Sequence, residues 1–244
     1  MENYTSFAKL YDQLFDLDMY LQWKDFVVKR SNPSKLLDLG GGNGRLGIIL
    51  SREKYQVTIL DLSLSMLQIA QSHAEKNNVE LQLINDDMTN FELNEKFNVI
   101  TSFSDSINYL SSKTEIQTMF NHVFNHLNDS GVFLFDLITP HMANVTYDNY
   151  MYNNDDDPQN IFMWTTFPGE KKNSVDHDLK FFTYRKDIDA FKILREIHHE
   201  QTYENEVIMQ LLKNTGFKNI QYTADFGNSK VDENSDRVFF EARK

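Results

Sequence analysis

The strongest constraint on the fold is a glycine-dense turn at residues 40–44, which lies between an apolar strand and a helix. Residues 35–39 (Lys-Leu-Leu-Asp-Leu) predict the strand, and the residues after the turn open the helix. Glycine reaches positive φ and lets a backbone approach a ligand closely, and the free N–H groups of the helix start point at that ligand. This strand–turn–helix unit therefore predicts a site for an adenosine-bearing cofactor.

A second strand indicates where the ribose of such a cofactor binds. Residues 56–60 (Gln-Val-Thr-Ile-Leu) predict this strand, which ends at Asp61. An acidic residue about 20 positions beyond the first glycine accepts hydrogen bonds from both ribose hydroxyls in folds of this kind. We therefore expect Asp61 to contact the ribose.

The glycines fit two cofactors. Gly42-x-Gly44-x-x-Gly47 matches the dinucleotide fingerprint, whereas Gly40-x-Gly42-x-Gly44 after Asp38 is the pattern used for S-adenosylmethionine. A carboxylate beside the turn repels a pyrophosphate and attracts an ammonium or sulfonium group, by a few kcal/mol at ~4 Å. The sign of the charge favours S-adenosylmethionine, and an NAD-dependent oxidoreductase is the alternative.

Four segments that include these features resemble the motifs of the class I S-adenosylmethionine-dependent methyltransferases. The first three motifs correspond to residues 36–44, 60–67 and 85–91. Residues 97–110 correspond to the fourth strand and its loop, which faces the methyl group. The resemblance implies methyl transfer from S-adenosylmethionine to N or O of a small acceptor, with S-adenosylhomocysteine as the product.

The resemblance also implies roles for single residues. In the second motif, Asp61 holds the ribose and Leu62 lines the adenine pocket. In the third motif, Asp87 accepts a hydrogen bond from the adenine amino group and Met88 packs on the ring. The cofactor contacts implied by the motifs are Asp38, Gly40, Gly42, Asn43, Gly44, Asp61, Leu62, Met66, Asp87, Met88, Ser102 and Phe103.

The N-terminal stretch resembles a helical lid over the methionine end of the cofactor. Tyr4, Phe7, Ala8 and Tyr11 are spaced as on one face of a helix. Tyr11 is therefore predicted to contact the cofactor, and the competing interpretation is an amphipathic helix that buries these aromatic residues in the core.

Candidate residues for the acceptor side follow from their positions after predicted strands. His141 and Asp105 lie at carboxyl ends of strands, where doubly wound sheets bind ligands, and either is a candidate base. A surface histidine and a turn-stabilising carboxylate are the competing interpretations. Further candidates for contact with the acceptor, which otherwise pack in the core, are Asn108, Tyr109, Trp164 and Tyr184.

Strands alternate with helical patterns through residue 137, which predicts an α/β fold with a doubly wound, mostly parallel, seven-stranded Rossmann-like sheet. Ser63 and Thr114 are predicted to cap two of the helices. The helix at 204–214 precedes a closing pair of strands. The predicted strands of this sheet are 35–39, 56–60, 80–84, 97–102, 132–137, 219–225 and 237–242.

After Pro140 the pattern changes to aromatic and β-branched segments separated by polar turns. Residues 161–167, 179–184 and 191–198 predict an antiparallel meander, and Asp155-Asp-Asp157 is expected in a solvated loop. We therefore expect residues 1–140 and 203–244 to form the cofactor-binding domain. Residues 141–202 are expected to form an inserted antiparallel sheet over the acceptor site.

Composition limits the partners. The net charge is −12, and the 24 Lys and Arg residues are scattered, which disfavours nucleic acid and leaves RNA as a minority alternative. A small, neutral or cationic acceptor fits better.

The chain has no cysteine, so thiol chemistry is excluded, and no metal site is predicted although His122 and His126 have metal-ligand spacing. No apolar run approaches the ~20 residues of a membrane span, so a cytoplasmic location without membrane contact is expected. A regulatory module that binds the cofactor without transfer remains an alternative, and a monomer and a homodimer fit equally.

Overall fold

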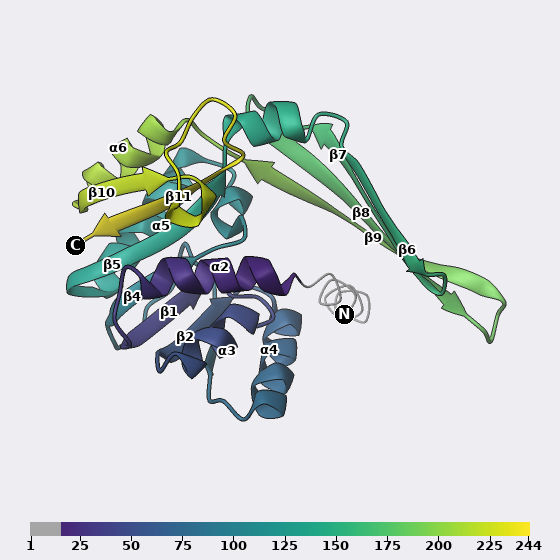
Figure 1. Ribbon diagram of the computed structural model, residues 1–244, viewed down its shortest axis with the longest axis horizontal. Coiled ribbons are helices and arrows are strands. Elements are labelled where there is room, and N and C mark those ends of the chain that lie inside the picture. The colour runs from purple at the N-terminus through teal and green to yellow at the C-terminus, as the bar shows by residue number, and fades with distance from the viewer. Residues whose placement is uncertain (1–15) are drawn as a thin grey trace.

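The computed structural model describes residues 16–244, and its main element is a seven-stranded sheet with the strand order β10-β11-β5-β4-β1-β2-β3 (Figure 1). Strands β1 to β5 pair in parallel, and β11 and β10 are antiparallel additions at one edge. The predicted α/β fold class is confirmed. The strands are β1 (Lys35–Leu39), β2 (Gln56–Asp61), β3 (Gln82–Asn85), β4 (Phe97–Ser102), β5 (Leu127–Ile138), β10 (Lys218–Thr223) and β11 (Arg237–Arg243).

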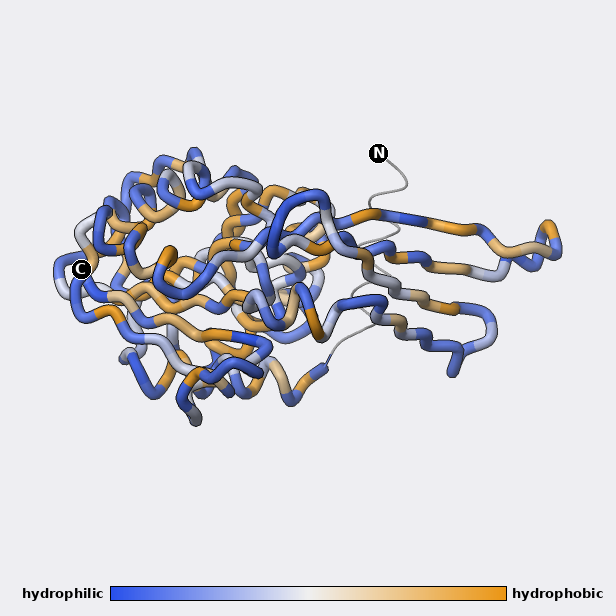
Figure 2. Tube along the Cα trace, turned by 90° about the horizontal axis from the view of Figure 1, so that it is seen from above, coloured by the Kyte–Doolittle hydropathy of each residue, from blue (hydrophilic) through white to orange (hydrophobic). Residues whose placement is uncertain are grey.

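Helices pack on both faces of this sheet, which makes it a doubly wound, three-layer structure. One face carries α2 (Leu17–Val28), α3 (Arg45–Arg52) and α4 (Leu64–Asn77), and the other α5 (Lys113–His126) and α6 (Asn205–Thr215). Hydrophobic residues concentrate along the chain in this body (Figure 2). Buried aromatic residues such as Trp23 of α2 and Phe120 of α5 each contribute roughly 1.5–3 kcal/mol by leaving water.

Helix caps explain where two of the helices begin. The Ser63 hydroxyl accepts a hydrogen bond from the Met66 N–H at 3.3 Å, as the sequence predicts for α4. The prediction that Thr114 caps α5 is wrong, because the Ser112 hydroxyl accepts from the Glu115 N–H at 3.2 Å. The helix therefore begins two residues earlier than expected. The Glu115 carboxylate also accepts from the Ser111 N–H at 2.7 Å, which ties the residue before the cap to the first turn.

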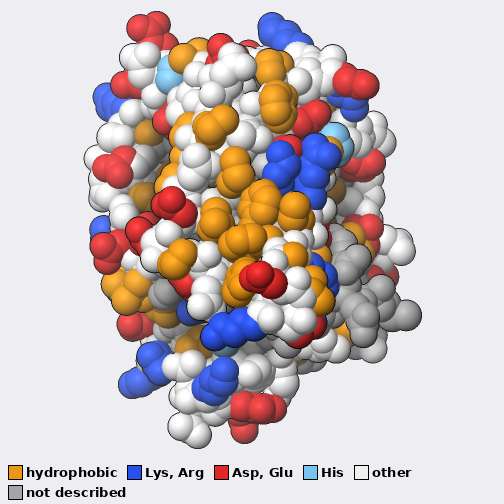
Figure 3. Space-filling model, turned by 90° about the vertical axis from the view of Figure 1, so that its right-hand side faces the viewer, with side chains coloured by type: hydrophobic (Ala, Val, Ile, Leu, Met, Phe, Trp, Pro, Cys, Tyr) orange, Lys and Arg blue, Asp and Glu red, His pale blue; other side chains and the backbone are white. Residues whose placement is uncertain are grey.

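A second, four-stranded antiparallel sheet projects from the body (Figure 1), and the predicted antiparallel insertion is confirmed. Asp155–157, expected in a loop, lie in its polar edge strand, which pairs with a neighbour despite its low strand propensity. Figure 3 views the molecule from the end where this sheet projects and shows apolar side chains gathered there between charged ones. The strands are β6 (Met151–Asp157), β7 (Asn160–Pro168), β8 (Ser174–Arg185) and β9 (Ala190–Gln201).

Short helical turns follow three strands of the main sheet. They are η2 (Ser106–Tyr109), η3 (Met142–Thr146) and η4 (Asp225–Gly227). Among the helices at residues 16–244, none combines the length and the apolar run that crossing a membrane requires.

Candidate active site

A cavity of about 980 Å³ opens at the carboxyl ends of β1, β2 and β4. Its volume is near the upper end of the usual range for small-molecule sites, which leaves room for a cofactor and a second substrate. Its wall includes α2, the glycine turn, the start of α4, the loops after β3 and β4, and β9. The predicted site residues that line it are Asp38, Gly40, Gly42, Asn43, Asp61, Leu62, Met66, Asp87, Met88, Phe103 and Tyr109.

Two positions of the glycine turn require glycine for different reasons. Gly42 has a φ of +54°, and a Cβ built on it meets no atom within 4 Å, so its backbone faces open space in the cavity. Gly44 has a φ of +75°, and its Cβ would lie 2.8 Å from the Cβ of Ala70. Gly44 is not among the described lining residues, and it brings the turn against α4 rather than against a ligand.

The Asp61 carboxylate is fixed at the cavity wall by the backbone. It accepts hydrogen bonds from the Gly42 N–H and the Ser63 N–H, both at 2.8 Å. Burial raises the pKa of Asp61, and the two hydrogen bonds oppose that shift. A carboxylate held beside a glycine turn in this way fits the recognition of ribose hydroxyls.

Asp38 is only 2% exposed and accepts a hydrogen bond from the Thr101 hydroxyl at 2.7 Å. Burial raises its pKa to about 7. A cationic ligand near Asp38 would favour the ionised form, because opposite charges attract strongly where water is scarce. Ser102, which was also predicted to contact the cofactor, is not among the described lining residues. Its hydroxyl donates to the buried Leu39 carbonyl at 3.0 Å and joins β4 to β1.

The residues implied for adenine line the same cavity. The Asp87 carboxylate accepts from the N–H and the hydroxyl of Thr89, both at 2.8 Å, which fixes the loop after β3. Leu62 is 74% exposed at the rim and offers an apolar surface to a flat ring. Tyr11 and the N-terminal lid lie outside the described residues.

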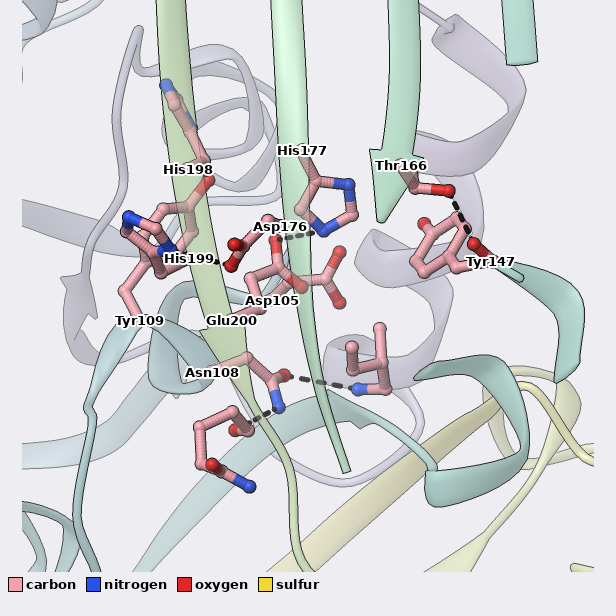
Figure 4. Close-up of polar contacts among 12 residues, drawn as sticks. Asp105, Asn108, Tyr109, Tyr147, Thr166, Asp176, His177, His198, His199 and Glu200 are labelled. Carbon is pink, nitrogen blue, oxygen red and sulfur yellow. Dashed lines mark hydrogen bonds and ion pairs between the residues drawn. The ribbon is translucent and has the colours of Figure 1, made fainter. Parts of the chain in front are cut away.

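Most acceptor candidates lie outside the described cavity lining, and three of them contact residues that are distant in the sequence. The Asp105 carboxylate pairs with the Arg237 guanidinium, with an Nη2–Oδ2 distance of 3.0 Å. The His141 Nδ1 lies 3.0 Å from the Asp236 carboxylate. Asn108 donates to the Gln201 carbonyl and accepts from the Ile138 N–H, both at 3.1 Å, and so joins η2 to β9 and β5 (Figure 4).

Two aromatic candidates belong to the second sheet. The Trp164 indole N–H donates to the His177 Nδ1 at 3.0 Å. The Tyr184 hydroxyl contacts Asp189 at the β8–β9 turn, at the free end of the projecting sheet. Of the acceptor candidates, Tyr109 alone is among the described residues that line the cavity.

Among the lining residues that the sequence analysis did not predict are Glu196 and His198 of β9. The Tyr109 hydroxyl lies 2.8 Å from the His198 Nδ1, and the His198 Nε2 lies 3.0 Å from the Glu196 carboxylate. Their spacing of two residues in a predicted strand was the available signal, because such residues share a face of the sheet.

The cavity wall is strongly acidic. No Lys or Arg is found among the lining residues that the structure describes. Such a wall favours cationic or neutral ligands over phosphates. Its acidic members are Asp38, Asp61, Asp86, Asp87, Glu115 and Glu196.

The fold and site define a cofactor-binding α/β enzyme, and comparison with known proteins identifies its class. A family model described as "Methyltransferase domain" matches residues 36–131. A Geobacillus sp. (strain WCH70) protein named "Putative methyltransferase" is 34% identical, with 99% of each chain covered. "Putative methyltransferase YqeM" of Bacillus subtilis is 33% identical, with 99% of this chain and 97% of that protein covered.

A solved structure agrees with these relatives. An S-adenosylmethionine-dependent methyltransferase from Clostridium acetobutylicum superposes with a TM-score of 0.85 at 28% identity, with 98% of each chain covered. The chain belongs to the class I S-adenosylmethionine-dependent methyltransferases. S-adenosylmethionine is its cofactor. The open Gly42 backbone and the fixed Asp61 carboxylate suit an adenosine-bearing cofactor of either kind, and the acidic wall favours the cationic S-adenosylmethionine over the pyrophosphate of NAD.

Proposed function

We propose that this enzyme methylates nitrogen or oxygen of a small, neutral or cationic acceptor. The observation that carries the proposal is the acidic cavity wall, which has no Lys or Arg among its described residues. A polyanion would be repelled at this wall, whereas an amine or an uncharged hydroxyl compound would not. The volume of about 980 Å³ suits two small ligands side by side.

Bound S-adenosylmethionine supplies a methyl group on a positively charged sulfur, a group that a lone pair displaces in line. The protein must hold the two reactants in that line, about 3–3.5 Å apart, and exclude water. The glycine turn and Asp61 hold the cofactor in this proposal, and Asp38 provides negative charge near its cationic end. The loop after β4 and strand β9 bound the remaining space, where the acceptor binds.

The projecting sheet has a place in this proposal as the cover of the acceptor site. Its strand β9 contributes Glu196 and His198 to the same cavity wall as the loops of the main sheet. We therefore assign residues 141–202 to acceptor selection, and residues 1–140 with 203–244 to cofactor binding.

An acceptor screen with radiolabelled S-adenosylmethionine tests the proposal. Small amines, amino alcohols, phenols and bulk RNA are compared by label transfer and by release of S-adenosylhomocysteine, with Asp61→Ala as the control. Transfer to a small amine or hydroxyl compound, lost in Asp61→Ala, is the expected result. Label found in RNA alone would contradict the proposal, and tight cofactor binding with only slow hydrolysis would favour a regulatory module.

A further inference from the structure

We propose that Tyr109 and His198 take the proton that the methyl acceptor loses, with Glu196 as the positioning residue for His198. This inference rests on the proposed function and assigns a proton path to it. Tyr109 of η2 is 48% exposed and lines the cavity together with His198 and Glu196 of β9. The three side chains form a chain of contacts of 2.8 Å and 3.0 Å that begins in the cavity.

The chemistry of the three groups fixes the direction of the hydrogen bonds. An ionised carboxylate only accepts, so a neutral His198 carries its proton on Nε2 and donates it to Glu196. The Nδ1 lone pair is then left to accept from the Tyr109 hydroxyl. The Tyr109 oxygen keeps lone pairs that accept a hydrogen bond from an acceptor N–H or O–H.

The surroundings of His198 keep this arrangement in place. The His198 and Glu196 side chains are 24% and 20% exposed, so water reaches them only in part. His198 lies opposite His177 of β8, and among residues 16–244 the titratable groups near it include Tyr109 from η2, Glu196 from β9 and His177 from β8. Glu200, further along the same face of β9, is buried and lies 3.5 Å from the His177 Nε2 (Figure 4).

The proton transfer balances with methyl transfer. The acceptor lone pair forms a bond to the methyl carbon as the carbon–sulfur bond breaks, and S-adenosylhomocysteine leaves with the electron pair. The acceptor proton passes to the Tyr109 oxygen while the phenolic proton passes to the His198 Nδ1. The resulting imidazolium is stabilised by the Glu196 carboxylate until the proton passes to solvent, and such assistance accelerates reactions by about 10²–10⁴-fold.

A second histidine–carboxylate pair, which joins β9 to its neighbour β8, provides a control. His199, the residue after His198, points to the opposite face of the sheet and lies 2.6 Å from the Asp176 carboxylate. Its side chain is 74% exposed, and neither member of this pair lines the cavity. Each face of the second sheet therefore carries a histidine–carboxylate pair. Only His198 also contacts Tyr109 and lines the described cavity.

The test compares Tyr109→Phe, His198→Asn and Glu196→Gln with His199→Asn on the full-length enzyme. We expect kcat to fall by about 10²-fold in Tyr109→Phe and His198→Asn, with the Kd for S-adenosylmethionine within twofold of wild type. We expect Glu196→Gln to change the acid side of the kcat–pH profile, which a purely structural contact would leave alone. His199→Asn is expected to match wild type throughout.

A spectroscopic measurement keeps the inference testable without a known acceptor. Nitrogen-15 NMR of the histidine side chains with S-adenosylhomocysteine bound is expected to show neutral His198 protonated on Nε2, with a smaller population of this tautomer in Glu196→Leu, which removes the accepting oxygen. An Nδ1-protonated His198 would overturn the inference. So would methyl transfer by Tyr109→Phe at the wild-type rate and pH profile, and in that case the proposed function itself would stand.

Discussion

The Asp61 carboxylate accepts a hydrogen bond from the Gly42 N–H across 2.8 Å, which joins the end of β2 to the glycine turn after β1. The same carboxylate accepts from the Ser63 N–H at the start of α4. One side chain thus sets the relative position of two loops that line the cavity. Removing it is expected to affect cofactor binding more than folding, because the rest of each loop keeps its own backbone hydrogen bonds.

Substitution of two glycines is expected to separate cofactor binding from packing. Gly42→Ala and Gly44→Ala both place a side chain at positive φ, which costs about 1–2 kcal/mol. Gly44→Ala also forces a contact of 2.8 Å with Ala70, so we expect its free energy of unfolding to fall by an additional ~1–3 kcal/mol. Urea unfolding measures this loss as a lower midpoint concentration. Gly42→Ala is expected to stay folded but to bind S-adenosylmethionine about tenfold more weakly, and equal effects on both properties would contradict this division.

Asp38 is expected to make cofactor affinity depend on pH. Burial raises its pKa to about 7, so in the free enzyme the carboxyl keeps its proton below that pH, and a cationic ligand must displace it. The affinity for S-adenosylmethionine should rise as pH increases toward about 7, by at most about tenfold per unit, and then level off. Calorimetry at several pH values checks this, with Asp38→Asn as the control. An equally pH-dependent Asp38→Asn variant would show that another group is responsible.

The raised pKa of Asp38 has the opposite effect on the stability of the protein without cofactor, which should decrease as pH rises. The unfolded Asp38 loses its proton near pH 3.8, whereas the folded one keeps it to about 7. The contribution of Asp38 to stability therefore falls as pH rises between these values. Urea unfolding of wild type and Asp38→Asn checks this. The difference between their free energies of unfolding should become smaller toward low pH.

Arg237 is expected to be essential for stability. It pairs with Asp105 and lies 3.1 Å from the fully buried Asp136 carboxylate, which also accepts from the Trp23 indole at 2.8 Å. Arg237→Met would leave these carboxylates without their cation, and we expect a loss of about 3–5 kcal/mol in urea unfolding.

The matched control is Arg185→Met, which removes an exposed pair with Asp187 at the far end of the second sheet. We expect little change there, because solvent screens exposed pairs. An equal effect of both substitutions would contradict the importance of the buried group.

Local signals in the sequence were enough to predict the strands that flank the candidate cofactor site. The strand–turn–helix pattern and the acidic end of the next strand lie within one stretch, and β1 (Lys35–Leu39) and β2 (Gln56–Asp61) form as expected. Strand β6 could not be predicted in this way, because its polar residues become a strand only by pairing with β7.

The residues that we propose for the acceptor side could not be predicted from local signals, because their arrangement depends on contacts between distant segments. Tyr109 meets His198 across 89 positions of sequence, and only the folded sheet brings them together. His141 was predicted from its place after a strand, yet its Nδ1 lies at hydrogen-bond distance from a residue 95 positions away, Asp236. Position along the chain predicts which loops are near a site, but not which side chains reach it.

Calorimetric titration tests the assigned cofactor site most directly. S-adenosylmethionine and S-adenosylhomocysteine are each titrated into wild type, into Asp61→Ala and into the distant control Asp187→Ala. We expect roughly micromolar binding of both ligands to wild type and Asp187→Ala, and at least about tenfold weaker binding to a folded Asp61→Ala. Wild-type affinity in Asp61→Ala, or no binding of either ligand to folded wild type, would contradict the assigned site.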